Sequence, residues 1–153
     1  MKLNCIVLDS NVFAKTFLQE GDTDVVKALL RFIGQNDIKV LCPDVFLYEV
    51  LSIAAQNGFP LSHAVRLLRS FEKANLYMAP LTDRQLQLAM KMAEDGNSKS
   101  GFPSIYDSAY HALALSCQGV FFTADKRHIS KAKGYGSVVF LDDWEAALSP
   151  KSS

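Results

Sequence analysis

The stretch Leu3–Phe13, LNCIVLDSNVF, contains the two patterns that decide the fold. Its first part, Leu3–Leu8, is a short apolar run with the length of a buried strand. Asp9 interrupts this run, and apolar residues at helical spacing follow from Asn11 to Leu18. A strand that leads directly into a helix is the first half of a β-α-β unit, in which the next strand runs parallel to the first.

The rest of the chain repeats this alternation of strand and helix. Short apolar runs predict further strands at Ile38–Cys42, Asn75–Pro80, Gly119–Thr123 and Ser137–Leu141. Helical patterns predict helices at Thr23–Asn36, Pro43–Ala55, Ser62–Ala74, Thr82–Glu94 and from Ser104 onward. This order predicts an α/β fold, a three-layer α/β/α sandwich whose central parallel sheet is covered by helices on both faces.

Length and composition are those of one ordinary globular domain. We expect a single domain over residues 1–148 and a short polar tail over 149–153, because 153 residues can bury roughly two thirds of the unfolded surface in one core. The chain is 49% apolar and 21% charged, which excludes a disordered protein. Its sixteen basic and sixteen acidic residues cancel, so any site for a polyanion must be a local patch.

The cysteines and the apolar runs favour a cytoplasmic protein. Cys5, Cys42 and Cys117 are odd in number and far apart, so we expect neither a disulfide framework nor a thiolate zinc site. The apolar start is too short for a signal-peptide core, and no run approaches the ~20 apolar residues that span a membrane. We therefore expect no membrane partner.

Isolated acids occur where a parallel sheet gathers its ligands. Asp9 follows the first strand, and Asp125 lies just beyond the fourth, at the carboxyl ends where open α/β sheets bind ligands. Glu49 lies on a helix that is apolar nearly all round, and Asp107 lies in the first turn of the helix that starts at Ser104. Each acid also has a purely structural explanation, in a helix cap, a turn or a solvent-exposed seam.

Together, the four acids predict a metal site. Carboxylates that share a pocket repel one another unless some are protonated or a divalent cation lies between them. Oxygen ligands without a His or Cys cluster favour Mg²⁺ or Mn²⁺ over zinc. Such an ion can lower the pKa of a bound water and neutralise charge on a phosphodiester, so metal-dependent phosphodiester hydrolysis is the resulting hypothesis.

Several segments carry a family resemblance over essentially the whole chain. IVLDSNVF, PDVFLYEV and YDSAYHALAL running into GVFFTADKRH resemble the PIN-domain ribonucleases, in particular the VapC-type toxins of prokaryotic toxin–antitoxin pairs. The resemblance implies a PIN-like sandwich and RNA as the substrate, cut to leave a 5′-phosphate and a 3′-hydroxyl. It implies a cognate antitoxin and a homodimer as partners. The catalytic, metal-binding and supporting residues that it implies are Asp9, Glu49, Asp107 and Asp125, supported by Ser10, Asn11 and Thr123.

The chain also departs from this pattern. Many relatives carry a further acid after the fourth motif, where this chain has Lys126, Arg127 and His128, so we expect one firmly bound ion. Lys126, Arg127 and Lys131, with Lys133, are predicted to contact RNA phosphates, although solvated charges on a short helix are an equal alternative.

Some aromatic and histidine side chains are assigned less specific roles. His111 is expected to be a core residue, and His128 to lie in a charged turn, as a structural or surface residue. Phe13 and Phe17 are most simply core residues, and part of this pair is a candidate surface for an antitoxin.

Three alternatives remain open at this point. A phosphatase of the haloacid dehalogenase type also starts with a strand that ends in Asp, but it needs a second Asp where this chain has Asn11. A PIN-like domain that binds RNA or protein without cutting would be favoured by a lost acid, and all four are present. A stand-alone RNA-processing nuclease is the third alternative, and a small basic or DNA-binding open reading frame immediately upstream would favour the toxin over it.

Overall fold

The computed structural model describes residues 5–19 and 21–149. Within these residues, one sheet holds five strands in the order β3-β2-β1-β4-β5, and every neighbouring pair is parallel. The strands are β1 (Cys5–Leu8), β2 (Lys39–Pro43), β3 (Leu76–Ala79), β4 (Val120–Thr123) and β5 (Val138–Phe140). The sheet confirms the prediction of a parallel arrangement.

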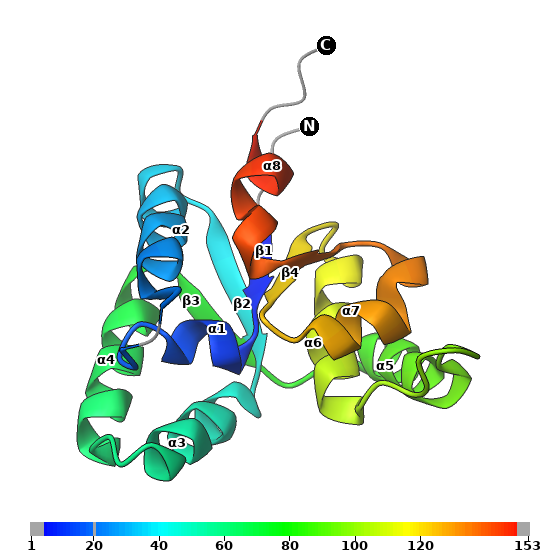
Figure 1. The fold of residues 1–153 in the computed structure, drawn as a ribbon, viewed down its shortest axis with the longest axis horizontal. Helices are drawn as coiled ribbons and strands as arrows, with labels where there is room; N and C mark the ends of the chain where they lie inside the picture. The colour runs from blue at the N-terminus through cyan, green and yellow to red at the C-terminus, as the bar shows by residue number, and fades with distance from the viewer. Residues whose placement is uncertain (1–4, 20, 150–153) are drawn as a thin grey trace.

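Helices cover both faces of the sheet (Figure 1). Helix α6 lies on one face with α5 packed against it, and α2 and α4 lie on the other. The helices are α1 (Ser10–Ala14), α2 (Thr23–Gln35), α3 (Phe46–Gln56), α4 (Leu61–Ala74), α5 (Asp83–Asp95), α6 (Ile105–Ser116), α7 (Lys126–Ala132) and α8 (Trp144–Leu148), with 3-10 turns η1 (Lys133–Tyr135) and η2 (Leu141–Asp143). The predicted α/β/α sandwich is therefore confirmed.

Strand β1 is the centre of the core. All four of its residues are buried, because helices cover both faces of a parallel sheet and leave neither side to solvent. Ile6 pairs with Val40 of β2 on one side and with Val120 of β4 on the other. The strand order therefore changes direction between β1 and β4, and the crevice outside the carboxyl ends of these two strands is the expected ligand site.

Local sequence signals set some helix starts, and two predicted helix boundaries need correction. Thr82 and Gln85 form a reciprocal capping box at α5, and the Ser104 hydroxyl accepts from the Asp107 backbone N–H at α6. Pro43 does not open a helix: it is the last residue of β2, because α3 begins only at Phe46. The predicted first helix is also shorter than expected, since α1 ends at Ala14.

The prediction that the cysteines form no disulfide is wrong. A disulfide joins Cys5 at the start of β1 to Cys117 at the end of α6, because α6 packs along β1 and brings together residues 112 positions apart. Gly119 makes room for this pair: a Cβ at that position would lie 2.5 Å from the Cys5 carbonyl oxygen and 2.9 Å from the Cys117 Sγ. Cys42 is buried and free.

Two further expectations concern surfaces. Phe13 is fully buried between the rings of Phe46 and Phe71, so it offers no docking surface. Phe17 is half-buried and stacks on Phe59. In the described part of the chain, no helix is both long enough and apolar enough to span a membrane.

Candidate active site

The four predicted acids lie at one edge of the sheet. Asp9 follows β1 and is the N-cap of α1, and its backbone N–H donates to the Phe122 carbonyl oxygen of β4 at 3.0 Å. Asp125 is the N-cap of α7, directly beyond β4. Glu49 and Asp107 lie in the first turns of α3 and α6. The strand crossover therefore delivers acids from four separate segments to the carboxyl-end crevice.

Hydroxyl groups fix the Asp9 carboxylate, which is only 3% exposed. The Thr123 Oγ1 donates to Asp9 Oδ2 at 2.7 Å, which joins the ends of β1 and β4. The Ser10 Oγ lies 3.3 Å from Asp9 Oδ1 and 3.4 Å from Glu49 Oε2, so its single proton is shared between two carboxylates. Ser10 and Thr123 are thus placed where supporting residues were predicted.

Glu49 has a partner that the sequence analysis missed. The Tyr110 hydroxyl donates to Glu49 Oε1 at 2.9 Å, across 61 residues of sequence. The Tyr110 ring is fully buried and stacks on Phe121 of β4, which fixes the position of its hydroxyl. In the sequence Tyr110 belongs to the apolar face of a helix, and no local pattern separates a tyrosine with a functional hydroxyl from a core aromatic.

The loop that carries Asp125 is held from two sides. The Asp125 backbone N–H donates to Thr123 Oγ1 at 3.0 Å, so one hydroxyl links Asp9 with the Asp125 backbone. The amide oxygen of Asn11 accepts from the Ala124 backbone N–H at 3.4 Å. The Asn11 side chain therefore positions the loop, and the Asn11 backbone hydrogen-bonds to Asp9, which opposes the rise in the pKa of that carboxyl.

The acids act on one another electrostatically. Burial raises the pKa of Asp9 to about 7, with further contributions from the charges of Asp107 and Glu49 and opposition from the Thr123 hydrogen bond. Burial also raises the pKa of Glu49, and the charge of Asp107 adds to it. The pKa of Asp107 is raised by burial and then by the charge of Asp125. Each carboxylate thus disfavours the ionised form of its neighbour, a cost that a bound cation would remove.

The donor set suits a hard cation held partly through water. In the residues described, no three side chains of the His, Cys, Asp and Glu types are grouped closely enough to hold an ion by themselves. Mg²⁺ commonly binds through one or two carboxylates and keeps several of its waters, so it does not require such a group. Carboxylate and hydroxyl oxygens line the crevice, and these are the ligands that Mg²⁺ and Mn²⁺ prefer.

Comparison with known proteins identifies the family. The model of the PIN domain matches residues 6–134, which include all four acids. The chain belongs to the PIN domain family. No curated protein sequence matches it.

Solved structures share the fold of this PIN domain at low sequence identity. One is the toxin VapC20 of Mycobacterium tuberculosis, described as cleaving the sarcin-ricin loop: TM-score 0.65, 12% identity, 82% of this chain and 93% of that chain covered. VapBC2 of Rickettsia felis, bound to a promoter DNA fragment, has a TM-score of 0.66 at 12% identity, over 89% and 96% of the two chains. FitAB bound to IR36 DNA has a TM-score of 0.65 at 15% identity, over 89% and 94%. At these identities the likeness concerns the fold.

A buried histidine pair connects the two helices that carry Asp107 and Asp125 in this PIN domain. His128 is 1% exposed, so the prediction that it lies in a charged turn is wrong, because α7 turns it inward against α6. His111 Nδ1 and His128 Nε2 are 3.1 Å apart, and His111 Nε2 lies 2.6 Å from the Gly136 carbonyl oxygen.

The hydrogen bonds fix the protonation of this pair. A carbonyl oxygen only accepts, so His111 Nε2 carries the proton and His111 Nδ1 accepts from His128 Nε2. Burial lowers the pKa of His111, and burial together with the neighbouring His111 lowers the pKa of His128 to about 4. Both rings are therefore neutral at pH 7, and His128 Nδ1 is left without a hydrogen-bond partner in the described structure.

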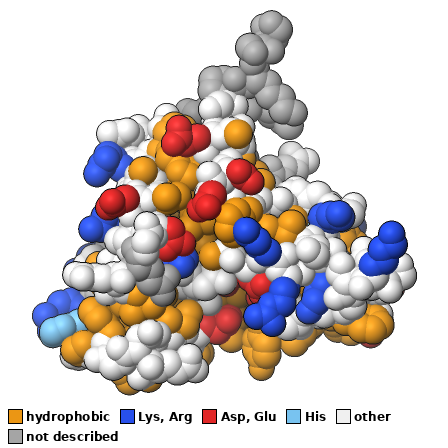
Figure 2. All heavy atoms as spheres, in the orientation of Figure 1, with side chains coloured by type: hydrophobic (Ala, Val, Ile, Leu, Met, Phe, Trp, Pro, Cys, Tyr) orange, Lys and Arg blue, Asp and Glu red, His pale blue; other side chains and the backbone are white. Residues whose placement is uncertain are grey.

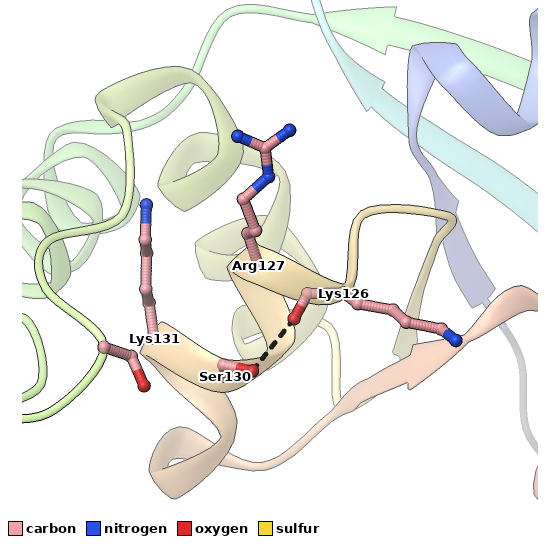
Figure 3. Close-up of a pocket in the computed structure, with 5 residues that line it drawn as sticks. Lys126, Arg127, Ser130 and Lys131 are labelled. Carbon is pink, nitrogen blue, oxygen red and sulfur yellow. Dashed lines mark hydrogen bonds between the residues drawn. The ribbon is translucent and has the colours of Figure 1, made fainter.

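The predicted RNA-binding residues are divided by the geometry of α7 (Figure 3). Arg127 and Lys131 extend in the same direction from the helix, whereas Lys126 extends away from them. The Lys126 ammonium lies 4.8 Å from the centroid of the Phe140 ring, a cation–π distance. Figure 2 shows acidic side chains next to Lys and Arg side chains near the lower middle of this face. The charge of Lys131 acts on Asp107, so at least part of the basic set lies near the acids.

Proposed function

We propose that this PIN domain is a metal-dependent endoribonuclease that hydrolyses RNA phosphodiester bonds with Mg²⁺ or Mn²⁺ as its cofactor. The supporting observation is the meeting of Asp9, Glu49, Asp107 and Asp125 at the crevice between β1 and β4, where each carboxylate acts on the ionisation of the next. A cluster of partly buried, mutually repelling carboxylates is costly unless a cation balances it. Membership of the PIN family supports a nuclease as the enzyme class.

In this proposal the four acids hold the ion, and the active unit is one domain over residues 1–148. The predicted tail lies outside the described residues apart from Ser149. When bound, the ion would lower the pKa of a water and neutralise charge that develops on the phosphodiester. The protein's own hydroxyls orient the ligands: Thr123 holds one Asp9 oxygen, Tyr110 holds one Glu49 oxygen, and Ser10 lies between these two acids.

The biological role that we propose is that of a toxin with a cognate antitoxin protein. Its support is the fold that this chain shares with VapC20, described as a toxin, and with the VapBC2 and FitAB structures. A homodimer and a cytoplasmic location belong to the same proposal.

The alternatives are now fewer. Membership of the PIN family removes the phosphatase of the haloacid dehalogenase type. A stand-alone processing nuclease and a domain that binds RNA without cutting it remain, and the same experiment separates the second of these from the proposal.

The test is RNA cleavage by purified protein with Mg²⁺ or Mn²⁺, with and without a chelator, beside an Asp107→Asn variant purified identically. Asp107 is half-buried at a helix start, and its backbone N–H donates to the Ser104 cap, a bond that Asn at this position retains, so the variant should fold normally. We expect cleavage that requires metal and disappears in the variant. Cleavage that persists in Asp107→Asn would refute the assignment, and binding without cleavage on RNAs of several folds would favour the non-cleaving alternative.

A further inference from the structure

A basic hollow adjoins the acidic crevice. It has a volume of about 420 Å³ and lies between α7 and the loop before α6; Ser100, Lys126, Arg127, Ser130 and Lys131 line it. The hollow and the acids share structure, because Asp125 caps the helix that supplies the basic residues and its Oδ1 accepts from the Arg127 backbone N–H at 2.9 Å. The charge of Lys131 also reaches Asp107, where it opposes the rise in that carboxyl's pKa.

Two cations that form no salt bridge in the described residues line this hollow. Arg127 and Lys131 are four residues apart on α7, so their side chains lie on one face of the helix, and Figure 3 shows them extending side by side. Neither forms a salt bridge with a carboxylate anywhere in residues 5–19 and 21–149. Two like charges held together are unfavourable, and an anion between them would remove that cost.

The opposite wall of the hollow is a fixed turn. Asn97 and Gly101 exchange two backbone hydrogen bonds of 2.8 Å, and Asn97 Oδ1 accepts from the Ser100 backbone N–H at 3.1 Å. Ser100 therefore faces α7 from a turn with a defined backbone. Ser130 contributes no donor, because its hydroxyl donates to the Lys126 carbonyl oxygen at 3.1 Å. The donors available for a ligand are the guanidinium of Arg127, the ammonium of Lys131 and the hydroxyl of Ser100.

We propose that this hollow binds a backbone phosphate of the RNA strand next to the phosphate that is cut. The inference rests on the proposed nuclease function and names a subsite for its substrate. The guanidinium of Arg127 and the ammonium of Lys131, on one face of α7, can both donate to the oxygens of a phosphodiester. The acids of the crevice repel a phosphate unless a cation is bound between them. Because Asp125 caps the helix that carries Arg127 and Lys131, a strand whose scissile phosphate lies at the acids would place a neighbouring phosphate at these two cations.

The subsite has a consequence for the choice of substrate. The strand must extend by at least one phosphate past the cleaved bond to gain the contact, which favours internal cleavage over removal of a terminal nucleotide. The contact is made to the backbone and is independent of the base sequence. Lys126 contributes less than Arg127 and Lys131 because its ammonium is held at the Phe140 ring.

Binding without catalysis tests the subsite first. The affinity for a short fluorescent oligouridylate is measured in chelator over a range of KCl concentrations, for the wild type, Arg127→Gln, Lys131→Gln and the matched control Lys27→Gln. Lys27 is exposed on α2, far from α7. For single strands the slope of log K against log salt changes by about 0.7 for each phosphate contact, so each α7 variant should lose roughly that amount and Lys27→Gln none. Equal losses in all three variants would overturn the proposal, since they would reflect net charge alone.

A substrate with one neutral phosphate tests the position of the contact. RNAs in which a single methylphosphonate replaces either phosphate beside the cleavage site are compared with the unmodified RNA by kcat/KM. At one of the two positions, the methylphosphonate should lower the kcat/KM of the wild type. The same substitution should not lower the kcat/KM of an Arg127→Gln, Lys131→Gln double variant, because that variant already lacks the contact. Additive losses at both positions would refute the subsite.

The two experiments separate the possible failures. If the wild type cleaves no RNA, the nuclease function fails, and the salt slopes still decide whether the hollow binds a backbone phosphate. An acidic protein segment is the other anion of suitable charge. A polyglutamate peptide that binds with the same dependence on Arg127 and Lys131, where the oligouridylate shows no such dependence, would overturn the RNA assignment in favour of a protein partner.

Discussion

Replacing Asp9 with Asn should remove a pH-dependent cost of folding from the ion-free protein. Burial, with the charges of Asp107 and Glu49, raises the pKa of Asp9 from 3.8 to about 7. The folded protein therefore binds this proton more tightly than the unfolded chain does, and its free energy of unfolding falls as the pH rises from about 4 through about 7. Asn has the shape of the protonated acid and cannot ionise, so Asp9→Asn should not show this loss.

The magnitude follows from the two pKa values. Between an unfolded pKa of 3.8 and a folded pKa of about 7, ionisation of Asp9 lowers the free energy of unfolding by roughly 2 kcal/mol at pH 5 and by roughly 4 kcal/mol at pH 8. The wild type should thus lose roughly 2–3 kcal/mol more than Asp9→Asn between these two conditions. The loss is large because Asp9 is only 3% exposed and solvent does not screen it.

Urea unfolding in chelator at pH 5 and pH 8 measures this difference. Comparing the two proteins cancels groups that titrate alike in both, including the histidine pair. Asp142→Asn, at an exposed acid outside the site, is the matched control and should follow the wild type. Adding Mg²⁺ at pH 8 should restore stability to the wild type and not to Asp9→Asn. Parallel pH dependences in all three proteins would refute the electrostatic reasoning.

Two further predictions concern side chains that hold the site. Tyr110→Phe keeps the stacking on Phe121 but removes the donor to Glu49, so we expect Mn²⁺ to bind about tenfold more weakly by calorimetry, with little change in the melting temperature. His128→Leu leaves His111 Nδ1 buried without a donor and should lower the free energy of unfolding by about 1–3 kcal/mol in urea at pH 7.5. Because the pKa of His128 is lowered to about 4, the wild-type pair contributes stability above pH 6.5 that is lost as the pH falls through about 4, and the variant should lose less over that range.

Control measurements distinguish these two specific effects from a general loss of stability. Phe121 stacking is retained in Tyr110→Phe, so a large drop in melting temperature would contradict a role confined to the hydroxyl. His63 is exposed, and His63→Leu should leave the unfolding free energy nearly unchanged. If His128→Leu proves as stable as His63→Leu, the hydrogen bond between the two buried rings makes no measurable contribution to the free energy of unfolding.

Much of the fold followed from local patterns. Apolar runs between helical patterns located all five predicted strands within a few residues, because the strands of a parallel sheet that helices cover are mostly apolar. The observed ends of elements differ from the predicted ends where a residue is compatible with two conformations. Pro43, for example, suits both the first turn of a helix and the end of a strand. The placement of the acids at strand ends was likewise predictable, since parallel strands present their carboxyl ends at one edge.

The partners of the acids were not predictable. Glu49 and Tyr110 meet only because α3 and α6 approach the same crevice, and the hydroxyl reaches the carboxylate across 61 residues of sequence. Such a contact depends on the rotation of both helices about their axes, which apolar periodicity specifies only to within a broad face.

By itself, the sequence determined the alternation of strands and helices, the parallel sheet and the edge at which the isolated acids gather, because these depend on local periodicity and on the order of elements. Tertiary packing alone decided the links between distant segments: the disulfide of Cys5 with Cys117, the inward turn of His128 onto His111, and the placement of the Lys126 ammonium at the Phe140 ring, away from Arg127 and Lys131. The physical reason is that a side chain's neighbours across the core depend on how whole elements dock, and a rotation of one residue position along a helix changes every one of them.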